Sequence, residues 1–95
     1  DELDYAGQII KQMPGVKVEL AGHTDPRDIN TDEFPSNWEL SDARAEAVRK
    51  YFIDHFGIEP GRITTKGYAD TEPIVPNTSP ENMFMNRRTE IRIQE

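Results

Sequence analysis

Two residues of opposite charge, Asp25 and Arg44, have the types and positions that charge recognition needs. Asp25 directly follows an apolar run. Arg44 lies four residues after Leu40 and four before Val48, in the middle of the apolar face of a predicted helix. A charge buried on such a face without a partner is costly, so Arg44 needs an acid nearby. We expect Asp25 to meet it and the pair to bind a ligand that carries both charges.

A strand and a loop place Asp25. Val16, Val18 and Leu20 alternate with charged residues, which predicts a half-buried strand over residues 16–22. Ligands of open α/β sheets bind where the chain leaves the carboxyl ends of the strands, and Asp25 stands at such an exit. Residues 26–37 are rich in proline, asparagine and aspartate. They predict a fairly long loop, and such loops in compact domains are often functional.

The helix that carries Arg44 has clear signals at both ends. Ser36 and Glu39 have the spacing of a capping box, which predicts that the helix begins after Ser36. Gly57 is expected to stop it after about Phe56. The apolar residues that share the predicted face with Arg44 are Leu40, Ala47, Val48, Tyr51 and Phe52.

Four further segments complete the predicted order. A short amphipathic helix ends at Pro14, and its apolar residues are Leu3, Ala6, Ile9, Ile10 and Met13. A strand over residues 62–68 follows the central helix. This strand–helix–strand order predicts a parallel pair with a right-handed crossover. A helical turn near 81–86 and a strand over 89–93 are expected after an irregular, proline-containing stretch.

The composition bounds the class of protein. Ninety-five residues, 35% of them hydrophobic, suffice for one domain with one modest core. The net charge of −7 argues against nucleic acid and anionic membranes as partners, because both attract basic proteins. The lack of cysteine excludes disulfides and thiol chemistry. No apolar run approaches the roughly 18 residues of a membrane span.

Metal and catalytic chemistry find little support in the residues. His23 and His55 have no partner at metal-ligand spacing, and the loop acids, Asp28 and Asp32 among them, do not fit a calcium loop. No pair of carboxylates suits glycoside hydrolysis, and no Ser-His-Asp order with a nucleophile turn is present. We therefore expect no metal, no cofactor and no catalytic residue.

Four motifs resemble the OmpA-like peptidoglycan-binding family, in the family's order and at suitable spacing. They are Gly22-His23-Thr24-Asp25, Asn37-x-x-Leu40-Ser41-x-x-Arg44-Ala45, Gly67-Tyr68 and Asn86-Arg87-Arg88. The match covers residues 16–94. Within it, the run from Phe34 to Ser41, after a long insertion, resembles the MotB branch, the peptidoglycan-anchoring subunit of the flagellar stator.

This resemblance implies a two-layer α/β sandwich of the α+β kind, with a small mixed sheet and helices on one face. Residues 1–95 would be one such domain, a fragment of a longer membrane-anchored protein, with the family's usual first strand before Asp1. The domain would be periplasmic, on an inner-membrane protein. Its implied partners are the peptidoglycan stem peptide, a second copy in a homodimer, and the stator A subunit through the missing membrane segment.

The implied ligand is meso-diaminopimelate, whose side-chain end carries an ammonium and a carboxylate on one carbon. By resemblance, Asp25 takes the ammonium and Arg44 the carboxylate, which suits an arginine fork. Of the adjacent arginines Arg87 and Arg88, the family pattern favours Arg87 near the pocket, with Arg88 facing solvent. The supporting site residues would be Thr24, Asn37, Leu40 and Arg87.

Plainer interpretations stay open on the sequence alone. Asp25 also fits a turn acid before proline, Arg44 a structural bridge, and Asn37 a helix-start residue. Trp38 either packs against Phe34 or offers a platform for a sugar ring. The alternative functions are a peptidoglycan anchor of another OmpA-like envelope protein, a dimerisation module without a ligand, and, less favoured, a wall-cleaving hydrolase.

Overall fold

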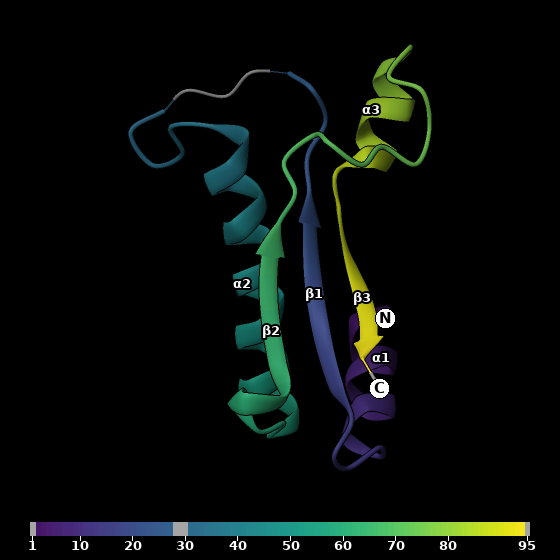
Figure 1. Cartoon of the computed structure of the whole chain (residues 1–95). Coiled ribbons are helices and arrows are strands. Elements are labelled where there is room, and N and C mark those ends of the chain that lie inside the picture. Colours follow the sequence, from purple (N-terminus) through teal and green to yellow (C-terminus); the bar gives the residue numbers. More distant parts are fainter. Residues whose placement is uncertain (1, 28–30, 95) are drawn as a thin grey trace.

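The computed structural model describes residues 2–27 and 31–94, which form a small mixed sheet and its helices. In chain order the elements are α1 (Glu2–Lys11), β1 (Lys17–His23), α2 (Asn37–Phe56), the 3₁₀ turn η1 (Pro60–Arg62), β2 (Ile63–Gly67), α3 (Pro80–Asn86) and β3 (Arg88–Gln94). In Figure 1, α1 and α2 lie behind the sheet and α3 lies beyond one end of the strands. The predicted fold class is confirmed. Asp28, one of the loop acids considered above, lies outside the described residues.

The sheet places three chain segments at one end of the molecule. Its order is β2-β1-β3. β1 pairs in parallel with β2, so that Gly22 lies opposite Gly67, and antiparallel with β3, so that His23 lies opposite Arg88. The predicted parallel pair is therefore confirmed. The exits of β1 and β2 and the entry to β3 share this end of the sheet, which is where Asp25 and Arg87 lie.

The core lies between the sheet and α2, and the two backbones approach closely at the end that carries Asp25. A Cβ atom on Gly22 would lie 2.0 Å from the carbonyl oxygen of Ser41. One on Gly67 would lie 2.7 Å from the backbone nitrogen of Asp42. The first turns of α2 are therefore held directly against β1 and β2. The buried apolar cluster comprises Ile10, Val18, Leu20, Ala45, Phe52, Ile58 and Ile63.

This close packing corrects the predicted face of α2. Ser41 and Ala45 are fully buried, whereas Ala47, which was expected on the apolar face, is exposed. The reason is that strand residues without side chains admit small helix residues, so the helix turns its Ser41–Ala45 side to the sheet. Arg44 consequently lies at the edge of the buried face, half-buried, and not in its middle.

The contact of α1 is also narrower than its pattern predicted. Leu3 and Ile9, expected to be buried, are each 37% exposed, while Ile10 is 2% exposed. Gly7 is buried because the ring of Phe56 packs on it, and a Cβ atom there would lie 2.5 Å from ring carbons. The helix therefore contacts α2 through the side that carries its glycine. None of the described helices combines the length and apolar character that a membrane crossing requires.

Both predicted ends of α2 are confirmed. The hydroxyl oxygen of Ser36 accepts a hydrogen bond from the backbone N–H of Trp38 at 3.2 Å, and the hydroxyl donates to the Glu39 carboxylate. Gly57 has a left-handed backbone with φ of 65°, and its N–H donates to the Ile53 carbonyl at 3.0 Å. The capped start fixes where the helix begins relative to the preceding loop.

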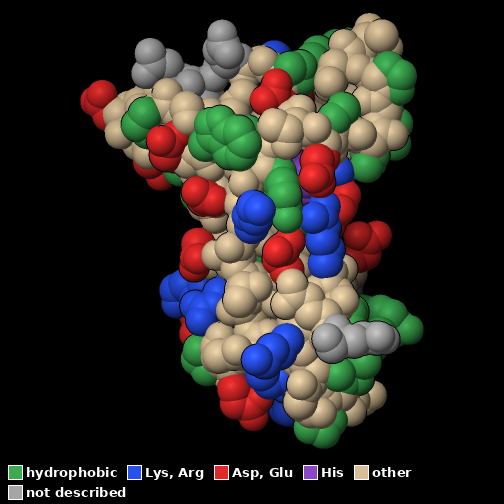
Figure 2. All heavy atoms as spheres, viewed as in Figure 1, with side chains coloured by type: hydrophobic (Ala, Val, Ile, Leu, Met, Phe, Trp, Pro, Cys, Tyr) green, Lys and Arg blue, Asp and Glu red, His purple; other side chains and the backbone are tan. Residues whose placement is uncertain are grey.

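The sheet face opposite α2 carries charged side chains around one aromatic ring. His23 stacks on Tyr68 with 5.4 Å between ring centroids, and the Arg92 guanidinium lies 4.8 Å from the same ring. Arg92 also forms ion pairs with Glu72 at 2.8 Å and Glu19 at 3.6 Å. In Figure 2 basic and acidic side chains lie together over the middle of this face. The network covers this face of the sheet and lies apart from the cavity described next.

Candidate ligand-binding site

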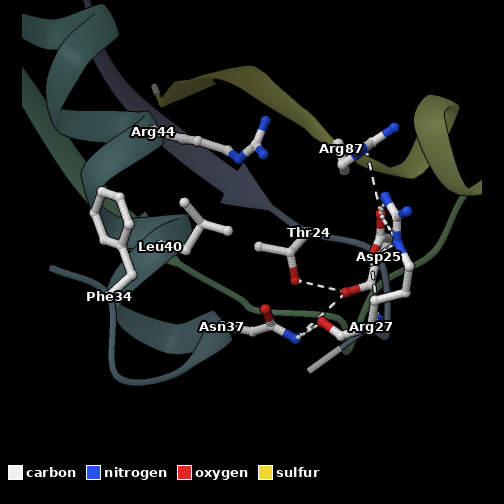
Figure 3. A pocket seen from close by; sticks show the side chains of 8 residues that line it. All are labelled: Thr24, Asp25, Arg27, Phe34, Asn37, Leu40, Arg44 and Arg87. Carbon is white, nitrogen blue, oxygen red and sulfur yellow. Dashed lines mark hydrogen bonds and ion pairs between the residues drawn. The ribbon is translucent and has the colours of Figure 1, made fainter. Parts of the chain in front are cut away.

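A cavity of about 480 Å³ opens at the end of the sheet where β1 and β2 stop. Its walls come from the exit of β1, the loop before α2, the first turns of α2 and the residue before β3 (Figure 3). All six residues predicted for the site line it, together with two that were not predicted. The lining residues are Thr24, Asp25, Arg27, Phe34, Asn37, Leu40, Arg44 and Arg87.

Asp25 is the acidic member of this cavity, and its side chain is only 6% exposed. Its carboxylate accepts hydrogen bonds from Arg27: Nε lies 3.2 Å from each oxygen, Nη2 lies 2.7 Å from Oδ2, and the backbone N–H lies 3.0 Å from Oδ1. Nε of Arg87 lies 3.3 Å from Oδ2. The Arg27 hydrogen bond is the main cause that lowers the pKa of Asp25, against an opposing effect of burial.

The expected contact between Asp25 and Arg44 is wrong. In the described part of the chain Asp25 is ion-paired with Arg27 and Arg87, and in Figure 3 the Arg44 guanidinium lies apart from the carboxylate with no interaction drawn between them. Arg27 takes the acid because it is only two residues away, within one turn, so that little conformational freedom is lost in pairing. Arg44 therefore does not form a structural bridge to Asp25, one of the interpretations that the sequence left open.

Arg44 is left as an unsatisfied cation at the cavity wall. Its Nε is buried and has no hydrogen-bond partner. Burial is the main cause that lowers the pKa of Arg44, and the positive charge of Arg87 lowers it further, while Asp25 acts in the opposite direction. Nε of Arg87 is also buried without a hydrogen-bond acceptor, although it is ion-paired with Asp25. Two guanidinium groups therefore offer donors that a carboxylate is suited to accept.

Thr24 and Asn37 hold the turn that carries Asp25. The Thr24 hydroxyl donates to the Asp25 carbonyl at 3.0 Å, and the Asn37 amide donates to the Arg27 carbonyl at 3.1 Å and the Asp25 carbonyl at 3.4 Å. The backbone N–H of Thr24 donates to the Ala69 carbonyl at 2.8 Å. These bonds tie the exit of β1 to the start of α2 and to the segment after β2, so the acid has a fixed position.

Of the two adjacent arginines, Arg87 lies in the cavity wall, as the resemblance favoured. Arg88 instead donates from Nε to Glu90 at 2.7 Å and from Nη2 to the Glu72 carbonyl at 2.8 Å, on the charged face of the sheet. The junction between α3 and β3 is fixed by Asn86, which is fully buried. Its side chain accepts from the backbone of residues 74 and 75 and donates to the carbonyl of residue 75 and the side chain of residue 77.

Sequence reasoning missed Arg27 and Phe34 as lining residues. A base two positions after an acid, with proline between them, was the available signal for Arg27, because such a turn brings the two side chains together. Phe34 was considered only as a packing partner for Trp38; it lines the cavity near Leu40 (Figure 3), and Trp38 is 53% exposed. Phe34 and Leu40 thus form the apolar wall of an otherwise charged cavity.

The chemistry that this arrangement supports is charge recognition. Asp25 is the single carboxylate among the described lining residues, and glycoside hydrolysis uses two. Groups of three or more His, Asp or Glu side chains that would hold a metal are not found among the described residues. One buried acid, three arginines and an apolar wall can attract groups of both charges and cover an apolar chain.

The fold and the cavity together define the class of protein. The OmpA family model matches residues 1–87, so this chain belongs to the OmpA family. The family resemblance inferred from the four sequence motifs is confirmed.

Individual relatives show which proteins of known sequence this chain resembles. YtxE of Bacillus subtilis strain 168 is 46% identical over 78 residues, which are 82% of this chain and 32% of that protein. Motility protein B of Helicobacter pylori strain J99 is 36% identical over 90 residues, which are 94% of this chain and 35% of that protein. The chain thus spans about a third of the length of these two curated relatives.

Solved structures share the fold closely. The C-terminal domain of Helicobacter pylori MotB matches with a TM-score of 0.91 at 33% identity, over 99% of this chain and 71% of that one. The cell wall anchor of the T6SS from Pseudomonas aeruginosa matches with a TM-score of 0.77 at 39% identity, over 96% of this chain and 65% of that one. The chain is therefore similar both to a MotB domain and to a cell wall anchor.

Proposed function

We propose that this domain binds peptidoglycan without cleaving it, through the diaminopimelate of the stem peptide, and so anchors a flagellar stator to the cell wall. The observation that supports this proposal is the separation of charge in the cavity. The buried Asp25 carboxylate lies on one side, and the Arg44 guanidinium, whose buried Nε has no hydrogen-bond partner, lies on the other. A zwitterion bound between Asp25 and Arg44 gives each group an opposite charge, and hydrogen bonds between charged groups are the stronger ones.

The ligand's two charges are assigned to the two walls. The ammonium lies at the Asp25 carboxylate, and the carboxylate on the same carbon lies at the Arg44 guanidinium. Leu40 and Phe34 cover the methylene chain of the diaminopimelate, while Thr24 and Asn37 keep the acid in place. Arg87 lies near both walls, because it contacts the Asp25 carboxylate and its charge acts on Arg44.

The proposal for the whole protein is supported by its relatives. Similarity to motility protein B and to the MotB domain supports a periplasmic domain of an inner-membrane protein that works in a stator. In that setting residues 1–95 are the wall-binding part of a longer chain. The protein acts as a homodimer and contacts the stator A subunit through a membrane segment elsewhere in the chain.

Titration with a purified muropeptide that contains diaminopimelate tests the binding function. We expect the wild-type domain to bind, and Asp25→Asn and Arg44→Gln to lose most of the affinity. Lys50→Gln removes the same positive charge as Arg44→Gln but from the exposed surface of α2, where Lys50 is ion-paired with Asp54, and should bind as the wild type does. Absence of binding by the wild type, or equal binding by all four proteins, would overturn the proposal.

A second candidate is a wall anchor for another envelope assembly, which the 39% identity to the T6SS cell wall anchor favours. Swimming in soft agar separates the two candidates. Deletion of the parent gene, or Arg44→Gln within it, abolishes swimming if the domain anchors a stator. Normal swimming together with retained muropeptide binding assigns the domain to another assembly. Steady release of fragments from purified sacculi would instead indicate a hydrolase.

A further inference from the structure

Asp25 is already covered by a cation that belongs to the chain itself. Arg27 places Nε and Nη2 against both carboxylate oxygens, at 2.7–3.2 Å. The Arg27 side chain is 56% exposed while that of Asp25 is 6% exposed, so Arg27 lies on the solvent side of the acid. A ligand ammonium that reaches Asp25 from the cavity must therefore replace this guanidinium or share the carboxylate with it (Figure 3).

The charges of the cavity do not balance. Among the described lining residues, three arginines face one carboxylate. Nε atoms of Arg44 and Arg87 are buried without hydrogen-bond acceptors. A ligand end with one ammonium and one carboxylate adds no net charge, so the excess of positive charge persists after it binds. Where the ammonium replaces Arg27 on the carboxylate, the freed guanidinium is one more cation without a partner.

We propose that Arg27 is a specificity-determining residue, which covers Asp25 until a ligand binds and which binds a second carboxylate of the stem peptide once the ligand's ammonium displaces it. This inference rests on the proposed function and deepens it, because it names the ligand class as a stem with at least two free carboxylates. The planar guanidinium fork suits such a group, and the exposed side chain has room to turn toward it.

Two carboxylates of the stem have this chemistry: the α-carboxylate of the glutamyl residue and the diaminopimelate carboxylate next to the peptide bond. Amidation removes the charge of either one and preserves its shape. Three synthetic peptides therefore serve as probes: L-alanyl-γ-D-glutamyl-meso-diaminopimelate, its glutamyl α-amide, and its amide at the diaminopimelate carboxyl nearest the peptide bond. Calorimetric titration of the domain with each gives the ratio of affinities.

We expect one of the two amides to bind the wild type roughly three- to tenfold more weakly than the free acid, as for a partly exposed charged pair. In Arg27→Gln this ratio falls to about one, because the variant lacks the guanidinium that binds the second carboxylate. Lys50→Gln, with the same change in net charge on an exposed part of α2, should keep the wild-type ratio.

The outcomes separate this inference from the proposed function. If the wild type binds all three peptides equally, or if Arg27→Gln keeps the wild-type ratio, Arg27 does not determine specificity, although peptidoglycan binding stands. If the wild type binds none of the peptides, the proposed function fails and this inference fails with it. Arg27→Gln removes an exposed side chain, and circular dichroism at matched concentration verifies that each variant is folded.

Discussion

Asp25 and Arg44 face one cavity from two different elements without pairing with each other. The acid, at the exit of β1, is paired with Arg27 and Arg87, and Arg44, on α2, keeps a buried Nε without an acceptor. A directly paired acid and base would have to separate before a zwitterion could enter. Here the guanidinium of Arg44 is already available to a carboxylate, and only the contact on the acid has to change.

Removing Arg27 should raise the pKa of Asp25 toward its ordinary value of 3.8, because the Arg27 hydrogen bond is the main cause of its lowering. A lowered carboxyl pKa stabilises the fold above pH 3.8, and this stability is lost as the pH falls through the lowered pKa. In Arg27→Gln the difference between the folded and unfolded pKa is smaller, so less stability is lost over this pH range than in the wild type. A carbon-13 titration of the Asp25 carboxyl measures the pKa in both proteins. Lys50→Gln should leave the titration unchanged, and an unchanged Asp25 pKa in Arg27→Gln would contradict the pairing.

Arg44 should contribute to binding and little to stability. Arg44→Met removes a half-buried charge with an unsatisfied Nε and leaves an apolar chain of similar length, so the free energy of unfolding should change by less than about 1 kcal/mol. Arg62 is the matched contrast, because its guanidinium donates to the carbonyls of Ile10, Met13 and Val16 at 2.7–2.9 Å. Arg62→Met should cost about 3 kcal/mol.

Urea unfolding and muropeptide titration of both variants test these expectations for stability and binding. Arg44→Met should lose binding at nearly wild-type stability, and Arg62→Met should keep binding, measured well below its unfolding midpoint, at reduced stability. A large loss of stability in Arg44→Met would mean that this arginine has a structural partner in solution.

Gly22→Ala should be strongly destabilising, because the new Cβ would lie 2.0 Å from the Ser41 carbonyl oxygen and the backbone of α2 has to move. We expect a loss of about 3 kcal/mol in the free energy of unfolding. Weaker ligand binding should accompany it, since the first turns of α2 carry Leu40 and Arg44. Gly61→Ala is the control, because a Cβ atom there meets nothing within 4 Å. Equal stability of the two variants in urea unfolding would contradict the described contact between helix and sheet.

Asn86→Ala should disturb both the fold and the cavity. Asn86 is fully buried, and its side chain bonds the 74–77 segment through both its oxygen and its nitrogen. Its loss should cost about 2–3 kcal/mol and weaken ligand binding, because Arg87 is the next residue. Asn82→Ala in the same helix removes a side-chain hydrogen bond of 3.4 Å to Thr78 and should be nearly neutral. Thermal unfolding and muropeptide titration measure both effects.

Much of the fold was predictable because its signals are local. Ser36 and Gly57 mark the ends of α2 through capping chemistry that depends on neighbouring residues alone, and alternation predicted the strands. The rotation of α2 was not predictable in this way. It depends on Gly22 and Gly67 lying side by side across two strands, which admits Ser41 and Ala45 to the sheet. A helical wheel contains no information about that partner.

The site was predictable at the level of its residues and not of their pairing. Asp25 and Arg44 were identified from a strand exit, a helix face and family motifs, and both line the cavity. The turn at Pro26 decides which basic residue is paired with Asp25, because it brings Arg27 back onto the carboxylate. Phe34 was missed for a similar reason, since its position in the apolar wall depends on how the loop before α2 is folded.

The central position of β1 has a mechanical consequence for the proposed binding of a wall ligand. Asp25 follows the end of β1, and β1 is hydrogen-bonded along its length to β2 on one side and β3 on the other. The hydrogen bonds of both ladders run across the strands. Tension applied through the ligand along β1 therefore shears both ladders at once, and many hydrogen bonds share the load. The same pull on an edge strand, directed sideways, would open its ladder one bond at a time.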